Sequence, residues 1–448
     1  MDIALNSGDT AWVLISAALV LLMTPGLALF YGGMVRSKSV LNMMMMSFGS
    51  MATVSVIWAL WGFSMVFGNS QGGLVGDPFE FFGLKGMFGE RLLGTPEAGG
   101  IPTMAFVAFQ AVFAIITVAL ISGAIADRAK FSTWLVFSVI WATLVYFPVA
   151  HWVFSFDGYV SEAGGWIANT LGAIDFAGGT AVHINAGAAG LALALVLGKR
   201  IGFGREAMRP HNLPLVMLGA GLLWFGWFGF NAGSALAANG TASLVFVNTL
   251  VATAAASLTW LLVEKVRDGH GTSLGAASGV VAGLVAITPS CSALTPVGAI
   301  ALGAIAGALC ALAVGLKFRF GYDDSLDVVG VHLVGGLVGT IGVGFFADQA
   351  AAAGAQGLFF GGGVDLLWRQ TVGALVVLAF SFIVTAVIGL ALEKTIGFRL
   401  DREAEAAGID LQEHAETGYD IGGYTGGRFG GTAPAPATSP RTTEEVSA

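Results

Sequence analysis

Long apolar segments separated by short polar connections make up most of this chain. Eleven such segments are each about 20 residues long, the length that an α-helix needs to cross the hydrocarbon core of a bilayer. The pattern therefore predicts an all-α polytopic membrane protein with eleven transmembrane helices. The predicted spans are 11–32, 42–67, 101–125, 132–153, 176–197, 213–236, 243–264, 272–289, 296–317, 328–347 and 370–392.

Basic residues alternate between the connections and so indicate the orientation. Of the 20 Lys and Arg residues, all except Lys85, Arg91 and Arg369 lie in the C-terminal tail or in connections that follow odd-numbered spans. The positive-inside rule makes that side cytoplasmic. We therefore expect the N-terminus outside the membrane and the C-terminus inside.

The first apolar segment, 11–32, stands where a signal peptide would. A signal peptide begins with a basic stretch, whereas residues 1–9 carry Asp2 and Asp9 and no Lys or Arg. The segment is also long for a signal-peptide core and contains Pro25. We expect it to be retained as the first span.

Composition supports the membrane assignment. The chain is 56% hydrophobic and 11% charged, whereas soluble domains carry about a quarter charged residues. Its net charge of −8 gives no indication of a nucleic-acid partner. Cys291 and Cys310 form neither a disulfide framework nor a metal-binding motif, and we interpret them as packing residues. The 66 glycines favour helices that pack closely through small residues.

The predicted orientations relate the two halves of the chain. Spans one to five and spans six to ten run in opposite senses, which indicates inverted repeats about an axis in the membrane plane, with span eleven added. Transporters built in this way place their sites at the repeat interface near the middle of the bilayer.

Two histidines lie in apolar spans, each eight residues after an aspartate. His183 follows Asp175, and His332 follows Asp324. Eight helical residues rise about 12 Å, and half of the hydrocarbon core is roughly 15 Å. Helices that enter from opposite faces therefore bring both histidines to mid-depth. A single buried histidine is most often a satisfied polar group, but two at mirrored depth indicate function.

The chemistry of these four residues follows from burial. Low dielectric disfavours imidazolium, so we expect two neutral rings, each with one donor and one acceptor nitrogen. Such a pair suits a polar solute or a proton, whereas a metal site needs ligands that neither span supplies. Asp175 and Asp324 are expected to cap the helices that follow them. Asp175 is also expected to face the outer vestibule and favour a cation there.

Aromatic residues form a third cluster of candidates. Phe109 and Phe113 are four residues apart in span three, and Phe230 and Ser234 are four apart in span six, so each pair shares a helix face. Stacked phenyl rings exclude water and hydrated ions. An aromatic face beside a hydroxyl holds a small cation by cation–π attraction of about 0.5–2 kcal/mol. Ordinary core packing or an interfacial aromatic belt is the competing interpretation.

Three motifs give the chain a specific resemblance. They are Pro25-Gly26-Leu27-Ala28-Leu29-Phe30-Tyr31-Gly32-Gly33, Asp175-Phe-Ala-Gly-Gly-Thr-Ala-Val-His-Ile-Asn185 and Trp227-Phe-Gly-Phe-Asn-Ala-Gly-Ser234. Through them the chain resembles ammonium transporters of the Amt/Mep/Rh family, the bacterial Amt branch in particular, over nearly its whole length. The resemblance implies a homotrimer in the plasma membrane (the bacterial inner membrane), surrounded by lipid, with one pore per subunit. It implies no enzymatic activity, cofactor or metal, and a role in nitrogen uptake.

The resemblance also assigns roles to individual residues. It implies an ammonium-recruitment site in the outer vestibule, a gate of stacked rings below it, and a hydrophobic pore lined by two histidines. The implied residues are Phe109, Ser234, Trp227 and Asp175 for recruitment, Phe113 and Phe230 for the gate, and His183 and His332 for the pore.

One position departs from the family pattern. Where the family completes the recruitment site with tryptophan, this chain has Phe154, whose cation–π face is weaker and which lacks an indole donor. The loop that follows, 155–172, is longer than expected. Either Trp152 or Trp166 turns into the vestibule, or recruitment is weaker.

The chain divides into three predicted parts. Residues 1–398 form the membrane domain, 399–421 a cytoplasmic regulatory tail, and 422–448 a disordered extension rich in Gly, Thr, Ala, Pro and Ser. The stretch 408–418 resembles the family's regulatory tail, which implies docking of a PII-type signal protein that plugs the pore.

These inferences combine into a mechanistic hypothesis. Ammonium, or methylammonium as an analogue, collects in the vestibule and loses its proton, and ammonia passes the phenyl gate and the histidines with net movement of charge. Three alternatives stay open: an ammonium sensor with little flux, a channel for another small neutral solute, and a membrane enzyme that uses the histidines. A sensor with a large appended signalling domain is disfavoured because the tail has only about 50 residues.

Overall fold

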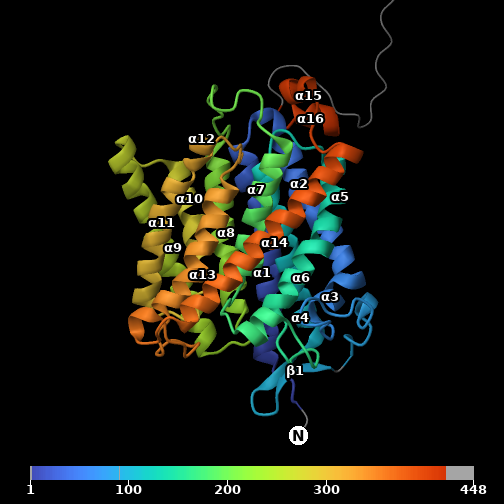
Figure 1. Cartoon of the computed structure of the whole chain (residues 1–448), viewed down its shortest axis with the longest axis vertical. Coiled ribbons are helices and arrows are strands. Elements are labelled where there is room, and N and C mark those ends of the chain that lie inside the picture. The colour runs from blue at the N-terminus through green and yellow to red at the C-terminus, as the bar shows by residue number, and fades with distance from the viewer. Residues whose placement is uncertain (1–2, 90, 420–448) are drawn as a thin grey trace, which may run out of the picture.

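A bundle of upright helices forms the body of the molecule (Figure 1). A computed structural model describes residues 3–89 and 91–419. In the first half the helices are α1 (Ser7–Met34), α2 (Val40–Ile57), α3 (Phe63–Phe67), α4 (Thr103–Ile121), α5 (Phe131–Trp141), α6 (Phe147–Phe154) and α7 (Asn185–Leu197). In the second half they are α8 (Leu213–Gly233), α9 (Gly240–Asp268), α10 (Ser273–Ile287), α11 (Pro296–Ala313), α12 (Leu316–Phe320), α13 (Val334–Phe346) and α14 (Asp365–Thr395).

All eleven predicted apolar segments coincide with helices. Ten helical stretches in the described part of the chain are long and apolar enough to cross a membrane, some of them made of two or more consecutive elements. The remaining predicted span, 272–289, corresponds to α10, which has 15 residues and is shorter than the others. The protein is therefore a multi-pass membrane protein, as expected for a plasma-membrane location.

Close contact between α1 and α8 holds the centre of the bundle together. A Cβ atom added to Gly219 of α8 would lie 2.4 Å from the backbone nitrogen of Phe30 in α1. From the other side, a Cβ on Gly26 of α1 would lie 3.1 Å from the Leu222 side chain. Helix association inside a bilayer depends on van der Waals packing, which small residues improve by letting backbones approach. This is the packing that the many glycines predict.

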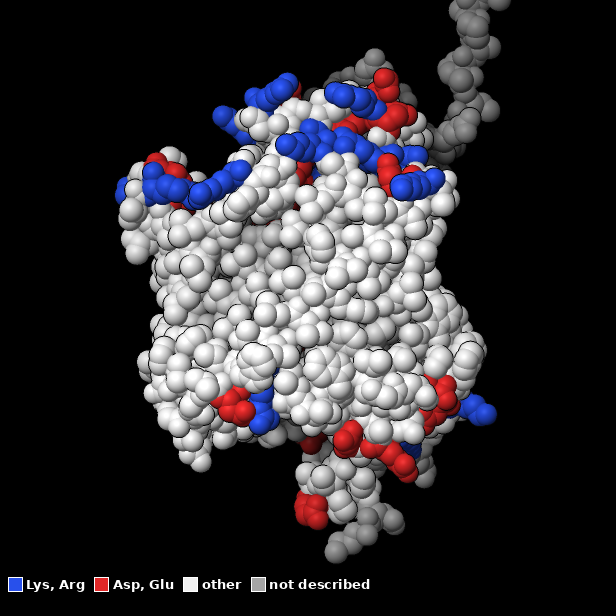
Figure 2. Space-filling model, in the orientation of Figure 1, with Lys and Arg blue, Asp and Glu red and all other residues white. Residues whose placement is uncertain are grey.

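Charged residues gather at the two ends of the bundle and leave an uncharged belt between them (Figure 2). Lys and Arg dominate the end that carries the C-terminal helices, and acidic residues are the more prominent charge at the other end in this view. The short hairpin of β1 (Leu92–Thr95) and β2 (Gly99–Pro102) lies at that other end, where Leu5 bridges to Gly100. We refer to the two ends as the basic end and the hairpin end.

Two short tail helices, α15 (Arg402–Ala407) and α16 (Ile409–His414), lie on the basic end. The carboxylate of Asp410 accepts hydrogen bonds from the backbone N–H groups of Leu41, at 3.0 Å, and Asn42, at 2.8 Å. These residues are in the first turn of α2, so the tail caps that helix. The predicted extension 422–448 lies outside the described residues.

Candidate functional site

Asp175 anchors the turn that carries His183. Its two carboxylate oxygens accept hydrogen bonds from the four backbone N–H groups of residues 178–181, at 2.7 to 3.2 Å. The π-helical turn η7 (Gly179–Ile184) begins there and leads into α7. The first N–H groups of a helix have no partner within it, and a carboxylate satisfies them. The predicted capping bonds are therefore present, and they fix where His183 lies.

Asp324 does the same from the basic end. It accepts from the N–H groups of Val328, at 3.1 Å, and Val329, at 2.7 Å. The π-helical turn η8 (Val329–Leu333), which contains His332, follows and leads into α13. Each histidine thus lies in a widened turn, and such turns occur frequently at functional sites.

The two histidines meet inside the bundle. His183 Nδ1 and His332 Nδ1 are 3.3 Å apart, and the ring planes are inclined by only 18°. Both side chains are buried, and the Nε2 atom of His183 has no partner in the described part of the chain. Between two neutral rings one nitrogen donates and the other accepts. The far nitrogen of one ring is then a donor and that of the other an acceptor.

Trp227 fixes one side of this pair. Its ring stacks on His183 with centroids 5.4 Å apart and planes inclined by 16°. The indole Nε1–H donates to the Thr288 hydroxyl at 2.8 Å. Because the indole N–H is satisfied by that hydroxyl, the tryptophan presents its aromatic face to the imidazole.

A pair of stacked phenyl rings separates two cavities. Phe113 of α4 and Phe230 of α8 have centroids 4.2 Å apart and planes inclined by 28°. Phe230 lines a small cavity of about 10 Å³ together with His183 and His332. That volume is about the minimum that one water molecule requires. Phe113 lines a much larger cavity of about 480 Å³.

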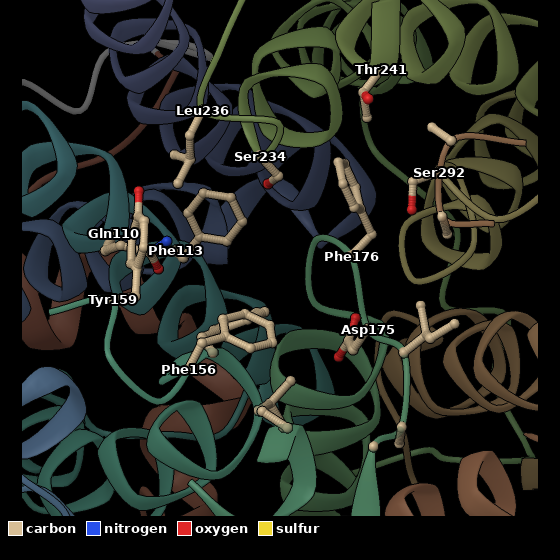
Figure 3. Close-up of a pocket in the computed structure, with 18 of the residues that line it drawn as sticks. Gln110, Phe113, Phe156, Tyr159, Asp175, Phe176, Ser234, Leu236, Thr241 and Ser292 are labelled. Atoms are coloured by element: carbon tan, nitrogen blue, oxygen red, sulfur yellow. The ribbon is translucent and has the colours of Figure 1, made fainter. Parts of the chain in front are cut away.

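This larger cavity, which we call the outer cavity, contains most of the predicted recruitment residues (Figure 3). Phe154, Asp175 and Ser234 line it, and the Ser234 hydroxyl donates to the carbonyl of Phe230 at 2.8 Å. Because its hydrogen is used in that bond, the Ser234 oxygen can accept a hydrogen bond from a donor in the cavity. Phe109 is fully buried, 5.0 Å from Phe113 by ring centroids, and lies behind the cavity wall.

The loop after α6 determines how the departure at Phe154 is accommodated. Trp152 donates its indole N–H to the carbonyl of Leu74 at 2.7 Å, and its ring lies 6.0 Å from that of Trp166. Neither tryptophan is among the residues that line the outer cavity. The loop instead contributes Phe156 and Tyr159, which the sequence analysis did not identify.

Other lining residues also escaped sequence reasoning. Gln110 directly follows Phe109 in α4, but it was not singled out. Thr241 and Ser292 come from elements far apart in the chain, so no local motif identifies them. Among residues 3–89 and 91–419, no group of three or more His, Cys, Asp or Glu side chains is placed to hold a metal ion.

Comparisons with known proteins give a consistent result. The chain matches the Ammonium Transporter Family over residues 11–419. It is 63% identical to an ammonium transporter of Mycobacterium tuberculosis, over 93% of this chain and 91% of that protein. The fold is similar to the crystal structure of Saccharomyces cerevisiae Mep2 (TM-score 0.79, 33% identity, 89% of this chain and 88% of that one). It is also similar to a structure described as a sensor Amt protein (TM-score 0.83, 31% identity, 91% of this chain and 98% of that one).

Proposed function

Because this chain belongs to the ammonium transporter family, we propose that it moves ammonium nitrogen across the membrane along the line from the outer cavity to the histidine pair. In this proposal the outer cavity recruits ammonium. Phe154 supplies an aromatic face and Ser234 an acceptor oxygen. Phe109 supports this site from behind the cavity wall, and Trp227 supports it from the side of the pore. Asp175 holds the turn η7, which carries His183.

The stacked rings of Phe113 and Phe230 determine whether ammonium or ammonia passes to the histidines. Stacked rings 4.2 Å apart leave no space for an ion with its hydration shell. A bare ion in this apolar surrounding loses hydration worth several kcal/mol. Ammonium therefore releases its proton at the gate, and neutral ammonia passes Phe113 and Phe230. Potassium has no proton to release and cannot donate a hydrogen bond.

The contact between His183 and His332 is the single observation that best supports this proposal. Two imidazoles 3.3 Å apart in a cavity of about 10 Å³ offer hydrogen bonds to a small neutral molecule and a route for a proton. No such polar pair is required for packing alone. Net charge moves if the proton travels through the pair while ammonia passes beside it.

Electrical recording tests this function. Vesicles that contain the purified protein are expected to give a current on addition of ammonium and none on addition of potassium. Acidification or alkalinisation of the vesicle interior, read with a pH dye, shows whether the proton accompanies ammonia. Equal currents for ammonium and potassium would contradict the proposal, as would transport of methylated or neutral solutes in preference to ammonium.

A sensor role is a second candidate, since one similar structure is described as a sensor Amt protein and the tail helices here contact the membrane domain. Uptake of methylammonium into cells that lack other carriers distinguishes the two. Substantial uptake favours transport, and binding without uptake favours sensing.

Orientation, assembly and regulation belong to the same proposal. We place the basic end in the cytoplasm, and the homotrimer and a PII-type partner that docks near α15 and α16 follow from the family resemblance. Native mass measurement in detergent tests the trimer. Protease access to the tail in sealed right-side-out and inverted vesicles tests the orientation.

A further inference from the structure

Tyr159 lies in the long loop that follows α6. It lines the outer cavity and also a groove of about 600 Å³ at the hairpin end, whose other lining residues include Glu80 and Arg91. Its ring packs against Phe106 at a centroid distance of 5.6 Å in an edge-to-face arrangement. The Tyr159 side chain is therefore within reach of a solute in either space.

The loop holds Tyr159 in a defined position. Asp157 accepts from the Gly164 N–H at 2.7 Å, and the Asp157 N–H donates to the side chain of Asn169 at 3.0 Å, which closes the base of the loop. Gly158, in the left-handed region with φ of 75°, turns the backbone immediately before Tyr159. These bonds are internal to the loop.

External contacts fix the loop to the rest of the molecule. Arg91 donates to the carbonyl of Val160 at 2.6 Å, and Ser161 donates to the carbonyl of Phe67 at 2.6 Å. Anchors on both sides of Tyr159 mean that the ring is preorganised and does not have to be ordered when a solute arrives. Preorganisation of this kind increases affinity because less conformational entropy is lost on binding.

The chemistry of Tyr159 complements that of the outer cavity. Figure 3 shows Tyr159 and Ser234 on different sides of the Phe113 ring. The surrounding aromatic residues, such as Phe154 and Phe156, offer faces but no acceptor. The phenol of Tyr159 is a neutral hydroxyl at physiological pH, and partial burial, which raises its pKa to about 12, favours that form further. A neutral phenol offers a cation both an acceptor oxygen and an aromatic face.

We propose that Tyr159 is a further ammonium-recruiting residue, whose hydroxyl oxygen accepts a hydrogen bond from the incoming cation and whose ring stabilises its charge. This inference rests on the proposed transport function. It assigns to the long loop an acceptor oxygen, which a phenyl ring such as that of Phe154 lacks, and an aromatic face in addition to that of Phe154.

The test uses full-length protein in vesicles and measures ammonium-driven current against ammonium concentration. Tyr159→Phe removes only the hydroxyl, so we expect the half-saturating concentration to rise about 3- to 10-fold with an unchanged maximal current, as for loss of one partly solvated hydrogen bond to a charge. Tyr159→Leu also removes the ring and is expected to raise it further. Tyr322→Phe removes a hydroxyl from a residue outside both cavities and serves as the matched control.

The possible results distinguish failure of the role of Tyr159 from failure of the proposed transport function. A wild-type current together with an unchanged half-saturating concentration in Tyr159→Phe overturns the role of Tyr159 and leaves the transport function standing. Absence of ammonium current in the wild type overturns both. A lower maximal current in Tyr159→Phe, with no change in half-saturation, also overturns it, because a purely structural residue would act in that way. If Tyr159→Leu does not fold, Tyr159→Phe alone decides.

Discussion

At Asp175, two carboxylate oxygens serve four backbone N–H groups. The charge of this residue is therefore engaged in holding the start of η7. His183 is only two residues beyond the last capped N–H. A small change in the backbone conformation of η7 would therefore move His183 away from His332, whose Nδ1 atoms are 3.3 Å apart.

Asp175→Asn is expected to destabilise the protein markedly. The amide keeps one acceptor oxygen but directs an NH2 group at N–H donors, leaving about two buried donors unpaired at about 1–3 kcal/mol each. Thermal unfolding in detergent should show a clear decrease in stability. Asp365→Asn, which affects an exposed ion pair with Arg369, is the control and should change stability by less than about 1 kcal/mol. Equal stability of the two variants would contradict the capping role.

Replacing His183 and His332 together by alanine tests the polar contact in the pore. The double variant removes both imidazoles from the small cavity beside Phe230, and we expect ammonium current to fall about tenfold or more, or discrimination against potassium to be lost. His270→Ala alters an exposed histidine between α9 and α10 and should behave as wild type. An unaltered ammonium current with intact selectivity would show that the histidine pair only fills space.

At the level of helices, glycine positions determine how closely α1 and α8 approach. Gly219 and Gly221 lie on the same helix, α8, but in different surroundings. A Cβ on Gly219 would come within 2.4 Å of Phe30 backbone, whereas a Cβ on Gly221 meets nothing within 4 Å. A glycine therefore matters for helix packing only where it lies on the face of α8 that contacts α1.

The pair Gly219→Ala and Gly221→Ala therefore forms a matched test. We expect Gly219→Ala to destabilise by about 1–3 kcal/mol because α1 and α8 must separate. Gly221→Ala is expected to be neutral or slightly stabilising because alanine is the better helix former by about 1 kcal/mol. The free energy of unfolding of both variants can be measured in a mild detergent by adding increasing amounts of a denaturing detergent. Similar effects of the two substitutions would contradict close α1–α8 packing.

Helix positions could be predicted from the sequence because apolar length is a direct consequence of bilayer thickness. The capping of η7 and η8 could also be predicted, since aspartate before an apolar run is a local signal. The widened turns had no such signal. The contribution of Tyr159 was not predictable either, because it depends on contacts of its loop with Arg91 and Phe67, which are distant in the chain.

At the scale of the whole molecule, the tail joins segments that are far apart in the chain. Beyond the cap on α2, Glu405 accepts from the Ile201 N–H at 2.6 Å, and Glu413 accepts from the Phe131 N–H at 2.9 Å. The tail thus contacts the start of α2, the start of α5 and the loop that contains Ile201, all at the basic end. Removal of the tail from this surface would break all three contacts together.

Asp410→Ala tests whether this docking is maintained by the carboxylate. Loss of two charge-assisted bonds to Leu41 and Asn42 should raise the population of undocked tail, so trypsin should cut after Arg402 about tenfold faster or more. Glu416→Ala removes an exposed carboxylate of the same tail at a distance from the cut bond and should leave the rate unchanged. Because local opening is fast relative to cleavage at low protease, the rate reports the equilibrium between docked and undocked tail. Equal cleavage rates for wild type and Asp410→Ala would mean that Asp410 does not hold the tail, and that the contacts made by Glu405 and Glu413 are sufficient to keep it in place.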